Sequence, residues 1–544
     1  MSEQALLGDE AVALGAIHAG ASSAYGYPGT PSTEIMEYLL QNAGAGGRPL
    51  ASWCANEKTA YEEALGASYA GRRVLVTMKH VGLNVAADPF VNSALLDIHG
   101  GFVLAVADDP GMHSSQNEQD SRFYAEYAKI ICLEPANQQE AYDMTREAFD
   151  VSERFHIPVM LRLTTRISHS RAGVAVSAPR GENPVIPRPD SSGWVFLPAR
   201  ARLSYRRLLE KQKDILAYSE ASGYNSLNLN SASAGYGVIT TGLGRNYYLE
   251  NSGDLAEEPP HLHIGVYPLP VEKIRRLAAS VKKLVIIEEG MPAAETAIRG
   301  VLPAGVEIRG KLDGFLPPDG ELDPDIVRGA LGLEKRARVS VDIQGLKIAA
   351  RPPQLCAGCP HGDTYALIKN LIGGLGSYSI TADIGCYSLG AAPPYSIPET
   401  IVCMGASIGM AKGAAEAGVK NAIAVIGDST FLHSGLTALI DAAARNTPMT
   451  LIILDNGTVA MTGTQETILP SRALVPLIRG IGVDPDHIIT IEAHRKNEKE
   501  NSEILRREVA YPGLSVIIAA RECLEAAKSR MKRRGKDETA GGTV

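Results

Sequence analysis

Residues 422–429 read AIAVIGDS and residues 449–458 read MTLIILDNGT, and these two stretches decide the fold. Each is a nearly continuous apolar run that ends in polar residues, which is typical of a central parallel strand covered on both faces. A helix expected at about 432–445 supplies the crossover that parallel strands need. Asp428 and Asn456 should therefore emerge together at the carboxyl edge of a sheet, where open α/β folds bind ligands.

The polar ends of these two strands carry oxygen ligands of the kind that Mg²⁺ prefers. Asp428 offers a carboxylate, Asn456 an amide oxygen and Thr458 a backbone carbonyl. Such a set leaves coordination positions for a diphosphate and a water molecule. The alternative is an ordinary strand end at which Asp428 caps the following helix.

The alternation of strands and helices continues outward along the chain. With 544 residues the chain is too long for one hydrophobic core, so several domains are expected. We expect an α/β fold with three doubly wound parallel-sheet units. The expected segments are a first unit at 1–175, a linker at 176–233, a second unit at 234–335, a third at 353–530 and a flexible tail at 531–544. We expect a charged helix around 200–217 in the linker and a strand at 261–266 in the second unit.

Composition excludes several classes of protein. The net charge of −8 argues against nucleic acid or an anionic membrane as a partner. No apolar run is long enough to span a bilayer, and the N-terminal residues lack the basic-then-apolar order of a signal peptide. We therefore expect a cytoplasmic protein.

Four of the seven cysteines form a pattern that suggests a metal centre. Cys356 and Cys359 have C-x-x-C spacing, Cys386 follows later, and Cys523 comes just after a predicted strand. Soft thiolates at such spacing hold either an iron–sulfur cluster or zinc. A thioredoxin-like redox pair fits less well, because the surrounding sequence does not begin a βαβ unit of that kind.

Together these motifs resemble the thiamine-diphosphate enzymes of the pyruvate:ferredoxin oxidoreductase superfamily. The resemblance rests on C-A-G-C at 356–359, D-I-G-C at 383–386, the late V-I-I-A-x-x-x-C at 516–523, G-D at 427–428 and D-N-G-T at 455–458. Residues 78–89, 113–122 and 356–361 resemble the indolepyruvate branch specifically. The resemblance covers nearly the whole chain and favours a [4Fe–4S] cluster over zinc, with Cys523 as the least secure ligand.

The resemblance also assigns roles to the three units. It implies a pyrimidine-binding first unit, a transketolase C-terminal-like second unit and a third unit that binds thiamine diphosphate and Mg²⁺. The residues implied to lie at the cofactor are Gly385, Gly427, Asp428, Ser429, Asn456 and Met461. Ser429 departs from the usual pattern, which has a second glycine there.

In the first unit, Glu57 matches the family's glutamate that hydrogen-bonds the aminopyrimidine ring. A carboxyl group at a helix start, partly removed from water, suits that role. Without the resemblance, Glu57 reads as an ordinary solvated helix residue. By analogy with the pyruvate enzymes, Thr30 and Arg122 are candidates to hold the 2-oxoacid carboxylate, although Arg122 also fits a simple helix-pairing role. Met461 stands where the pyruvate enzymes have a polar residue, so it predicts an apolar wall for an aryl side chain, unless it only fills the core.

The activity that follows is oxidative decarboxylation of an arylpyruvate to its acyl-coenzyme A, with reduction of ferredoxin or another electron-carrier subunit. A small β subunit is the implied partner, in an assembly with two of each chain. The two C-x-x-C-x-x-C-x-x-x-C-P runs of a ferredoxin-like domain, common in this branch, do not occur in this sequence, so we expect only the proximal cluster. The rival functions are a non-oxidative thiamine-dependent decarboxylase, an oxidoreductase with a different electron acceptor, and a cofactor-free assembly subunit.

Overall fold

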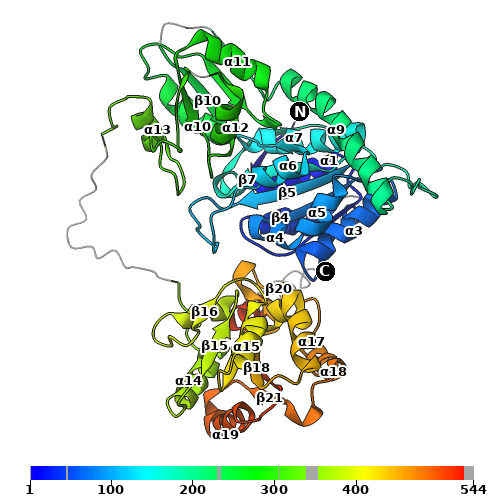
Figure 1. Ribbon diagram of the computed structural model, residues 1–544, viewed down its shortest axis with the longest axis vertical. Helices are drawn as coiled ribbons and strands as arrows, with labels where there is room; N and C mark the ends of the chain where they lie inside the picture. The colour runs from blue at the N-terminus through cyan, green and yellow to red at the C-terminus, as the bar shows by residue number, and fades with distance from the viewer. Residues whose placement is uncertain (1, 44–46, 230–234, 304, 338–352, 532–544) are drawn as a thin grey trace, which may run out of the picture. The chain divides into compact units, whose positions relative to one another are not determined.

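The computed structural model describes residues 2–43, 47–229, 235–303, 305–337 and 353–531 (Figure 1). The chain forms two compact units, Met1–Val341 and Asp342–Val544, which are considered separately below as unit 1 and unit 2. Apart from Met531, the expected tail lies outside the described residues. The α/β fold class with parallel sheets is confirmed in both units.

The first sheet of unit 1 has seven strands in the order β12-β6-β7-β5-β4-β2-β3. All neighbouring pairs are parallel except β12 with β6. The strands are β2 (Ser23–Gly26), β3 (Leu50–Trp53), β4 (Val74–Lys79), β5 (Phe102–Asp108), β6 (Ile131–Leu133), β7 (Val159–Thr164) and β12 (Val266–Tyr267). Strands β4, β5 and β7 are buried along their whole length, which agrees with their apolar sequences.

Helices cover both faces of this sheet. In Figure 1, α1 and α7 lie on one face and α3, α4 and α5 on the other. The helices are α1 (Gly8–His18), α2 (Thr33–Gln41), α3 (Glu57–Tyr69), α4 (His80–Val85), α5 (Ala87–Ser93), α6 (Arg122–Ala128), α7 (Gln138–Phe155) and α8 (Thr165–His169). An additional antiparallel pair, β1 (Ser2–Leu7) with β8 (Arg171–Val176), brings the start of α1 close to the end of α8.

The second sheet of unit 1 has the order β14-β13-β10-β11-β9, parallel except at β9. Its elements are β9 (Leu227–Asn228), β10 (Gly237–Thr241), α10 (Gly244–Ser252), β11 (His261–Ile264), α11 (Val271–Ser280), β13 (Lys283–Ile287), α12 (Ala293–Val301), β14 (Glu307–Arg309) and α13 (Pro324–Ala330).

The first two predicted α/β units exchange a strand in the structure. The strand expected at 261–266 is divided: β11 stays in the second sheet, whereas β12 joins the first. The division falls at Gly265, where the side-chain oxygen of Asn225 accepts the N–H groups of Gly265 and Val266, both at 2.9 Å. Because a strand crosses between the sheets and one apolar core reaches both, they form a single unit.

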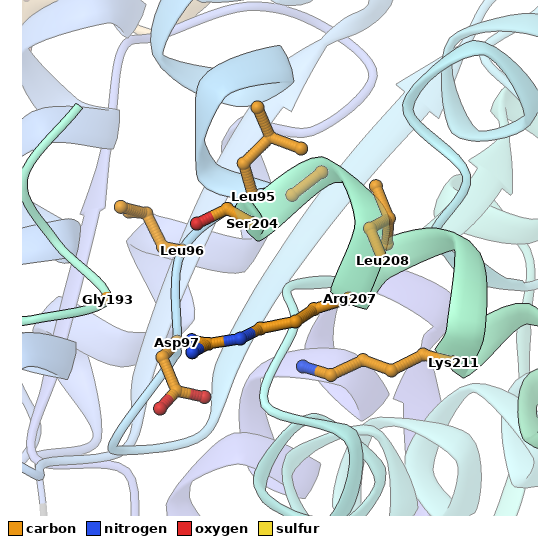
Figure 2. Close-up of a pocket in the computed structure, with 9 residues that line it drawn as sticks. Leu95, Leu96, Asp97, Gly193, Ser204, Arg207, Leu208 and Lys211 are labelled. Atoms are coloured by element: carbon orange, nitrogen blue, oxygen red, sulfur yellow. The ribbon is translucent and has the colours of Figure 1, made fainter. Parts of the chain in front are cut away.

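The predicted linker is also packed on unit 1. Its charged helix is longer than expected, α9 (Pro198–Ala221), and buries Leu208 and Ile215. Figure 2 shows a small pocket between α9 and the segment before β5, where Arg207 and Lys211 lie near Asp97. Lys211 is partly buried there, and this burial lowers its pKa. The carbon chain of the lysine therefore packs against the rest of unit 1, as it would not in a flexible linker.

Unit 2 contains a six-stranded, wholly parallel sheet in the order β16-β15-β17-β18-β22-β21. Its strands are β15 (Ser379–Ala382), β16 (Thr400–Ile401), β17 (Ala422–Gly427), β18 (Met449–Asp455), β21 (Ile488–Glu492) and β22 (Ser515–Ala520). One apolar core includes α14 (Pro360–Ile372) and α19 (Glu498–Val509), and a second includes α15 (Ala406–Glu416), α17 (Leu436–Ala444) and α18 (Leu474–Ile481). In neither unit does a described helix have the length and apolarity needed to cross a bilayer.

Candidate functional site

In unit 2, four neighbouring strands end in polar residues at the same edge of the sheet. Strands β15, β17, β18 and β22 are parallel neighbours, so their carboxyl ends lie together. The segments that follow them are 383–386, 428–430, 455–458 and 521–523. The two strands that were expected to carry Asp428 and Asn456 pair directly, with Gly427 opposite Leu454. The structure therefore brings the predicted oxygen ligands and two of the predicted sulfur ligands, Cys386 and Cys523, to one edge.

Asp428 is held in place by backbone groups rather than by a cation. Its Oδ1 accepts the N–H of Ser429 at 2.8 Å and its Oδ2 accepts the N–H of Gly457 at 2.9 Å. Burial, together with the adjacent carboxyl group of Asp455, raises the pKa of Asp428 to about 8. Two buried carboxyl groups in contact form a site that a divalent cation would stabilise. The predicted Mg²⁺ ligands thus fit that ion, and Asp455 is a nearby acid that the sequence interpretation left without a role.

The loop after β18 has a backbone shape that fixes the other predicted ligands. Gly457 has φ +71°, the left-handed region that favours glycine. Asn456 and Thr458 on either side of it are buried, and the Oδ1 of Asn456 accepts the N–H of Thr458 at 3.1 Å. Thr458 begins β19 (Thr458–Val459), which pairs with β20 (Gln465–Glu466).

Close packing explains why two of the predicted cofactor-binding positions are glycine. A Cβ atom at Gly385 or Gly427 would overlap the ring of Tyr387. The hydroxyl of Tyr387 donates to Asp383, and the hydroxyl of Thr430 donates to the carbonyl of Ile384 at 2.9 Å. These contacts join the loop after β15 to the loop after β17, so the glycines let the loops approach.

The four predicted cluster cysteines lie close to one another in unit 2. Cys359 caps α14, Cys386 follows Gly385, and Cys523 follows β22. Burial raises the pKa of Cys386 to about 12, and the other three thiols add to the rise. Burial also raises the pKa of Cys359, with contributions from Cys356 and Cys523.

Zinc and an iron–sulfur cluster differ in the spacing of sulfur atoms that they require. Zinc bound to four thiolates at about 2.3 Å would hold the sulfur atoms within roughly 3.8 Å of one another. Within the described ranges, the single group of three or more His, Cys, Asp or Glu ligand atoms within 4.8 Å of one another is Asp9, Glu34 and His169, so no three of the cysteine sulfur atoms lie that close together.

Arg521 and His361 are residues near this edge that the sequence interpretation missed. Arg521 bonds the carbonyl of Gly358 and the carboxylate of Asp363, each at 2.7 Å, which fastens the C-A-G-C loop to the end of β22. His361 is buried, and one ring nitrogen lies 3.2 Å from the side-chain nitrogen of Asn456. Burial lowers the pKa of His361 to about 4, helped by the charge of Arg521. The C-P-H sequence directly after the cysteine pair was the available signal for His361.

In unit 1, Thr30 and Glu57 follow neighbouring parallel strands, β2 and β3, at the carboxyl edge of the first sheet. Glu57 begins α3 as expected and is buried, with 6% of its surface exposed, so it is not a solvated helix residue. Gly82 in α4 packs against it, since a Cβ there would lie 2.5 Å from Oε1 of Glu57. Thr30 is half-buried, and its carbonyl accepts the hydroxyl of Ser114 at 3.3 Å.

A buried lysine lies at the same edge. The ammonium of Lys79, at the end of β4, donates to the carbonyl and hydroxyl of Ser114 at 2.8 and 3.0 Å, and lies 3.9 Å from Asp109. Burial lowers the pKa of Lys79 to about 8, while Asp109 raises it. The loop that contains Ser114 thus connects Lys79 to Thr30. Lys79 stands in the stretch that resembles the indolepyruvate branch, which was the available signal for it.

The contacts of Arg122 favour the pairing role that was left open for it over the substrate role. Its guanidinium is buried and contacts Asp120 at 2.5 and 2.9 Å, Glu288 at 2.9 Å and the carbonyl of Met291 at 2.9 Å. The side chains of Thr241 and Tyr267 take its remaining donor capacity, at 3.3 and 3.1 Å. Acceptors from both sheets of unit 1 engage the N–H groups of Arg122. Arg122 therefore links these two sheets and has no N–H group left for a substrate carboxylate.

Met461 lies in a short helical turn, Ala460–Thr462, and is 52% exposed. It is therefore not a core filler of unit 2. Ile468 and Leu469, a few residues later, are also exposed apolar side chains. This loop consequently presents apolar surface next to the Thr458 end of the predicted Mg²⁺ site.

In comparisons with known proteins, one family model matches within unit 1 and another within unit 2. Residues 14–198 match the family described as pyruvate flavodoxin/ferredoxin oxidoreductase, thiamine diP-bdg. Residues 383–518 match the family described as thiamine pyrophosphate enzyme, C-terminal TPP binding domain.

Curated relatives match over nearly the whole chain. A protein of Archaeoglobus fulgidus named indolepyruvate oxidoreductase subunit IorA is 37% identical, over 98% of this chain and 88% of its own length. The protein of that name from Methanothermobacter thermautotrophicus is 36% identical, over 95% and 86%. A solved structure of 2-oxoglutarate:ferredoxin oxidoreductase from Magnetococcus marinus has a TM-score of 0.50 at 17% identity, over 60% of this chain and 65% of that one, which is a likeness of fold.

Proposed function

The chain belongs to the family of the indolepyruvate oxidoreductase subunit IorA, thiamine-diphosphate-dependent 2-oxoacid:ferredoxin oxidoreductases, and we propose that it oxidatively decarboxylates aryl 2-oxoacids to their acyl-coenzyme A thioesters. Its partners in this proposal are a small β subunit, in an assembly with two of each chain, and ferredoxin or another electron carrier.

Unit 2 would hold the diphosphate through Mg²⁺. Asp428, Asn456 and Thr458 supply carboxylate, amide and backbone oxygens, and a divalent cation would offset the burial and the neighbouring carboxyl group of Asp455 that together raise the pKa of Asp428. Asp455 accepts the N–H of Gly457 at 3.2 Å and the hydroxyl of Ser471 at 2.7 Å, so it supports the loop beside the ligands. Thiamine diphosphate, when bound, supplies the carbon nucleophile and the electron sink for decarboxylation.

Glu57 in unit 1 would hydrogen-bond the aminopyrimidine ring and handle its proton. Its position at the first turn of α3, its burial and the contact with Gly82 hold the carboxyl group in one place. Thr30 and Lys79 lie at the same sheet edge. A lysine ammonium is suited to a substrate carboxylate, and Lys79 is therefore a better candidate for that contact than the engaged Arg122.

The observation that carries the redox part of the proposal is a single hydrogen bond. The N–H of Cys523 donates to the carbonyl of Asn456 at 3.1 Å, so a proposed cluster ligand is attached to a proposed Mg²⁺ ligand. A [4Fe–4S] cluster held by Cys356, Cys359, Cys386 and Cys523 would accept electrons beside the cofactor, one at a time. The exposed Met461 would face the aryl group of the substrate.

The test is anaerobic purification with the partner subunit, followed by iron and sulfide analysis and turnover of a panel of 2-oxoacids. We expect about four irons per chain, and faster turnover of indolepyruvate and phenylpyruvate than of pyruvate or 2-oxoglutarate, with coenzyme A and a low-potential acceptor. Cys523→Ser should lose the iron, whereas Cys403→Ser, which alters another exposed cysteine of unit 2, should keep it.

Two outcomes would contradict the proposal in different ways. Zinc, or no iron, together with aldehyde formation would favour the non-oxidative decarboxylase. Full activity in Glu57→Gln would remove Glu57 from the mechanism, because loss of a positioned acid–base group costs about 10²–10⁴-fold in rate.

A further inference from the structure

Three side chains of unit 1 that the proposed reaction does not use gather at one place. Asp9 of α1, Glu34 of α2 and His169 of α8 each offer a ligand atom, and these atoms lie within 4.8 Å of one another. Nε2 of His169 is 3.4 Å from Oε2 of Glu34. Metal–ligand distances of about 2.0–2.2 Å would place ligand atoms up to about 4.2 Å apart. Only a small inward movement is therefore needed to bind one ion.

The backbone holds these three helices together at this point. Gly8 lies so close to the carbonyl of Ile167 that a Cβ would not fit, so the start of α1 packs directly on α8. The β1–β8 pair fixes the same junction from the outside, with Leu7 opposite Arg171. The three side chains thus project from positions that the fold has already set.

Asp9 is the feature that calls for a ligand. It is fully buried, and neither of its carboxylate oxygens has a hydrogen bond of ordinary length and angle, although the side chain of Ser168 and the N–H of Ile35 lie close enough to offset part of the rise in its pKa that burial causes. A buried polar group without a partner costs about 1–3 kcal/mol, more when charged. The neighbouring acid Glu10 is already satisfied, because it accepts the N–H of Leu7 at 2.8 Å and pairs with Arg171 at 3.3 Å.

Access and charge at this place suit a cation. The side chains of Glu34 and His169 are each 35% exposed, so the group opens to solvent above the buried Asp9. The set contains two carboxyl groups and one imidazole, and a metal ion would have to displace protons from it, because burial raises the pKa of Asp9 and the hydrogen bond to Glu34 raises the pKa of His169. Imidazole together with carboxylate oxygens suits first-row transition ions, whereas Mg²⁺ and Ca²⁺ prefer oxygen alone.

We propose that Asp9, Glu34 and His169 bind one divalent transition-metal ion of the Mn²⁺ or Zn²⁺ class, at a site separate from the Mg²⁺ site of unit 2. Three protein ligands leave further positions for water. The ion would tie α8, which follows β7, to α2, which follows the Thr30 loop, and so would fix the carboxyl edge of the first sheet.

The test is titration of the full-length protein, loaded with Mg²⁺ and thiamine diphosphate, with MnCl₂ while free Mn²⁺ is measured by electron paramagnetic resonance. Mn²⁺ is the suitable probe because thiolates are poor ligands for it. We expect one more tight Mn²⁺ per chain in the unaltered protein than in His169→Ala or Asp9→Asn. Loss of one ligand should weaken binding at least ~100-fold, since even outer-shell changes cost 10–100-fold. Pulsed measurement should detect an imidazole nitrogen coupled to this Mn²⁺, lost in His169→Ala.

Glu126→Gln, which removes an exposed carboxylate on α6, is the control and should bind as the unaltered protein does. Asp9→Asn keeps the shape of the side chain, and the partial exposure of His169 makes its variant safe for folding, which metal-free denaturation will check. Equal Mn²⁺ uptake in all proteins, or binding only at millimolar Mn²⁺ without nitrogen coupling, overturns the proposal. Because metal uptake is measured without turnover, this result is independent of the proposed enzymatic activity.

Discussion

Unit 1 and unit 2 each bury a cluster of acidic side chains at the carboxyl edge of a parallel sheet, but only one cluster contains its own cations. In unit 1, the carboxylates of Asp108, Asp120, Glu134 and Glu288 each contact Arg122 or Arg162. In unit 2, Asp428 has backbone N–H groups and a second carboxyl group as its partners. The first arrangement holds the fold together, whereas the second leaves negative charge for an external cation.

The partner of a buried acid, either an arginine or a second acid, distinguishes structural acids from ligand-binding acids without reference to sequence motifs. A carboxylate paired with a buried arginine is stabilised by the chain itself, and breaking the pair leaves a charge without compensation. A carboxyl group with a raised pKa beside another acid is destabilised until a metal binds. Substitutions should therefore affect folding in unit 1 and cofactor binding in unit 2.

The largest expected effect on ligand binding is that of Asp428→Asn. We expect at least ~100-fold weaker binding of Mg²⁺ and thiamine diphosphate, because a carboxylate ligand is removed. The cofactor-free protein should lose less than about 1 kcal/mol of stability, since the change relieves a buried acid beside Asp455. Calorimetric titration and urea denaturation measure the two quantities. Unchanged cofactor affinity would mean that the two acidic clusters do not differ in function.

The next effect is on folding. Arg162→Met should lower the free energy of unfolding by about 3–5 kcal/mol, because Asp108 and Glu134 would remain buried without their partner. Arg495→Met, which alters a mainly exposed arginine paired with Asp363, should cost less than about 1 kcal/mol. Urea denaturation of both variants gives the comparison. Equal losses would show that the buried network does not stabilise unit 1.

The smallest expected effect is that of Arg122→Lys, which distinguishes a structural role for Arg122 from a role in substrate binding. Arg122→Lys should cost about 2 kcal/mol of stability, because an ammonium cannot make the forked contacts to Asp120 and the carbonyl groups. The KM for the 2-oxoacid should change less than about threefold. A KM rise above about tenfold with unchanged stability would instead place Arg122 on the substrate.

Local patterns were sufficient where one stretch of sequence determines the structure. The apolar runs at 422–426 and 449–454 predicted two central strands, and both are found, in parallel contact. The helix start at Glu57 was likewise predicted, and in the structure the side chain of Asn56 caps this helix by accepting the N–H of Thr59.

Long-range partners could not be predicted in this way. Arg122 is followed by an ordinary helix, while its contacts at Thr241, Tyr267 and Glu288 are more than a hundred residues away. The expected strand at 261–266 gave no sign that its last residue would join another sheet. Residues 2–7 contain no alternation of apolar and polar residues, and their strand forms because β8 lies beside them.

The two-residue strand β12 determines where this chain can be truncated. Val266 and Tyr267 cover the outer edge of β6 with backbone hydrogen bonds, and an uncovered edge strand invites pairing with other chains. A fragment that ended at residue 175 would expose that edge, and a fragment that began at 234 would carry β12 without its partner. Truncation and gene fusion should therefore respect the boundary between unit 1 and unit 2, and treat residues 2–337 as indivisible.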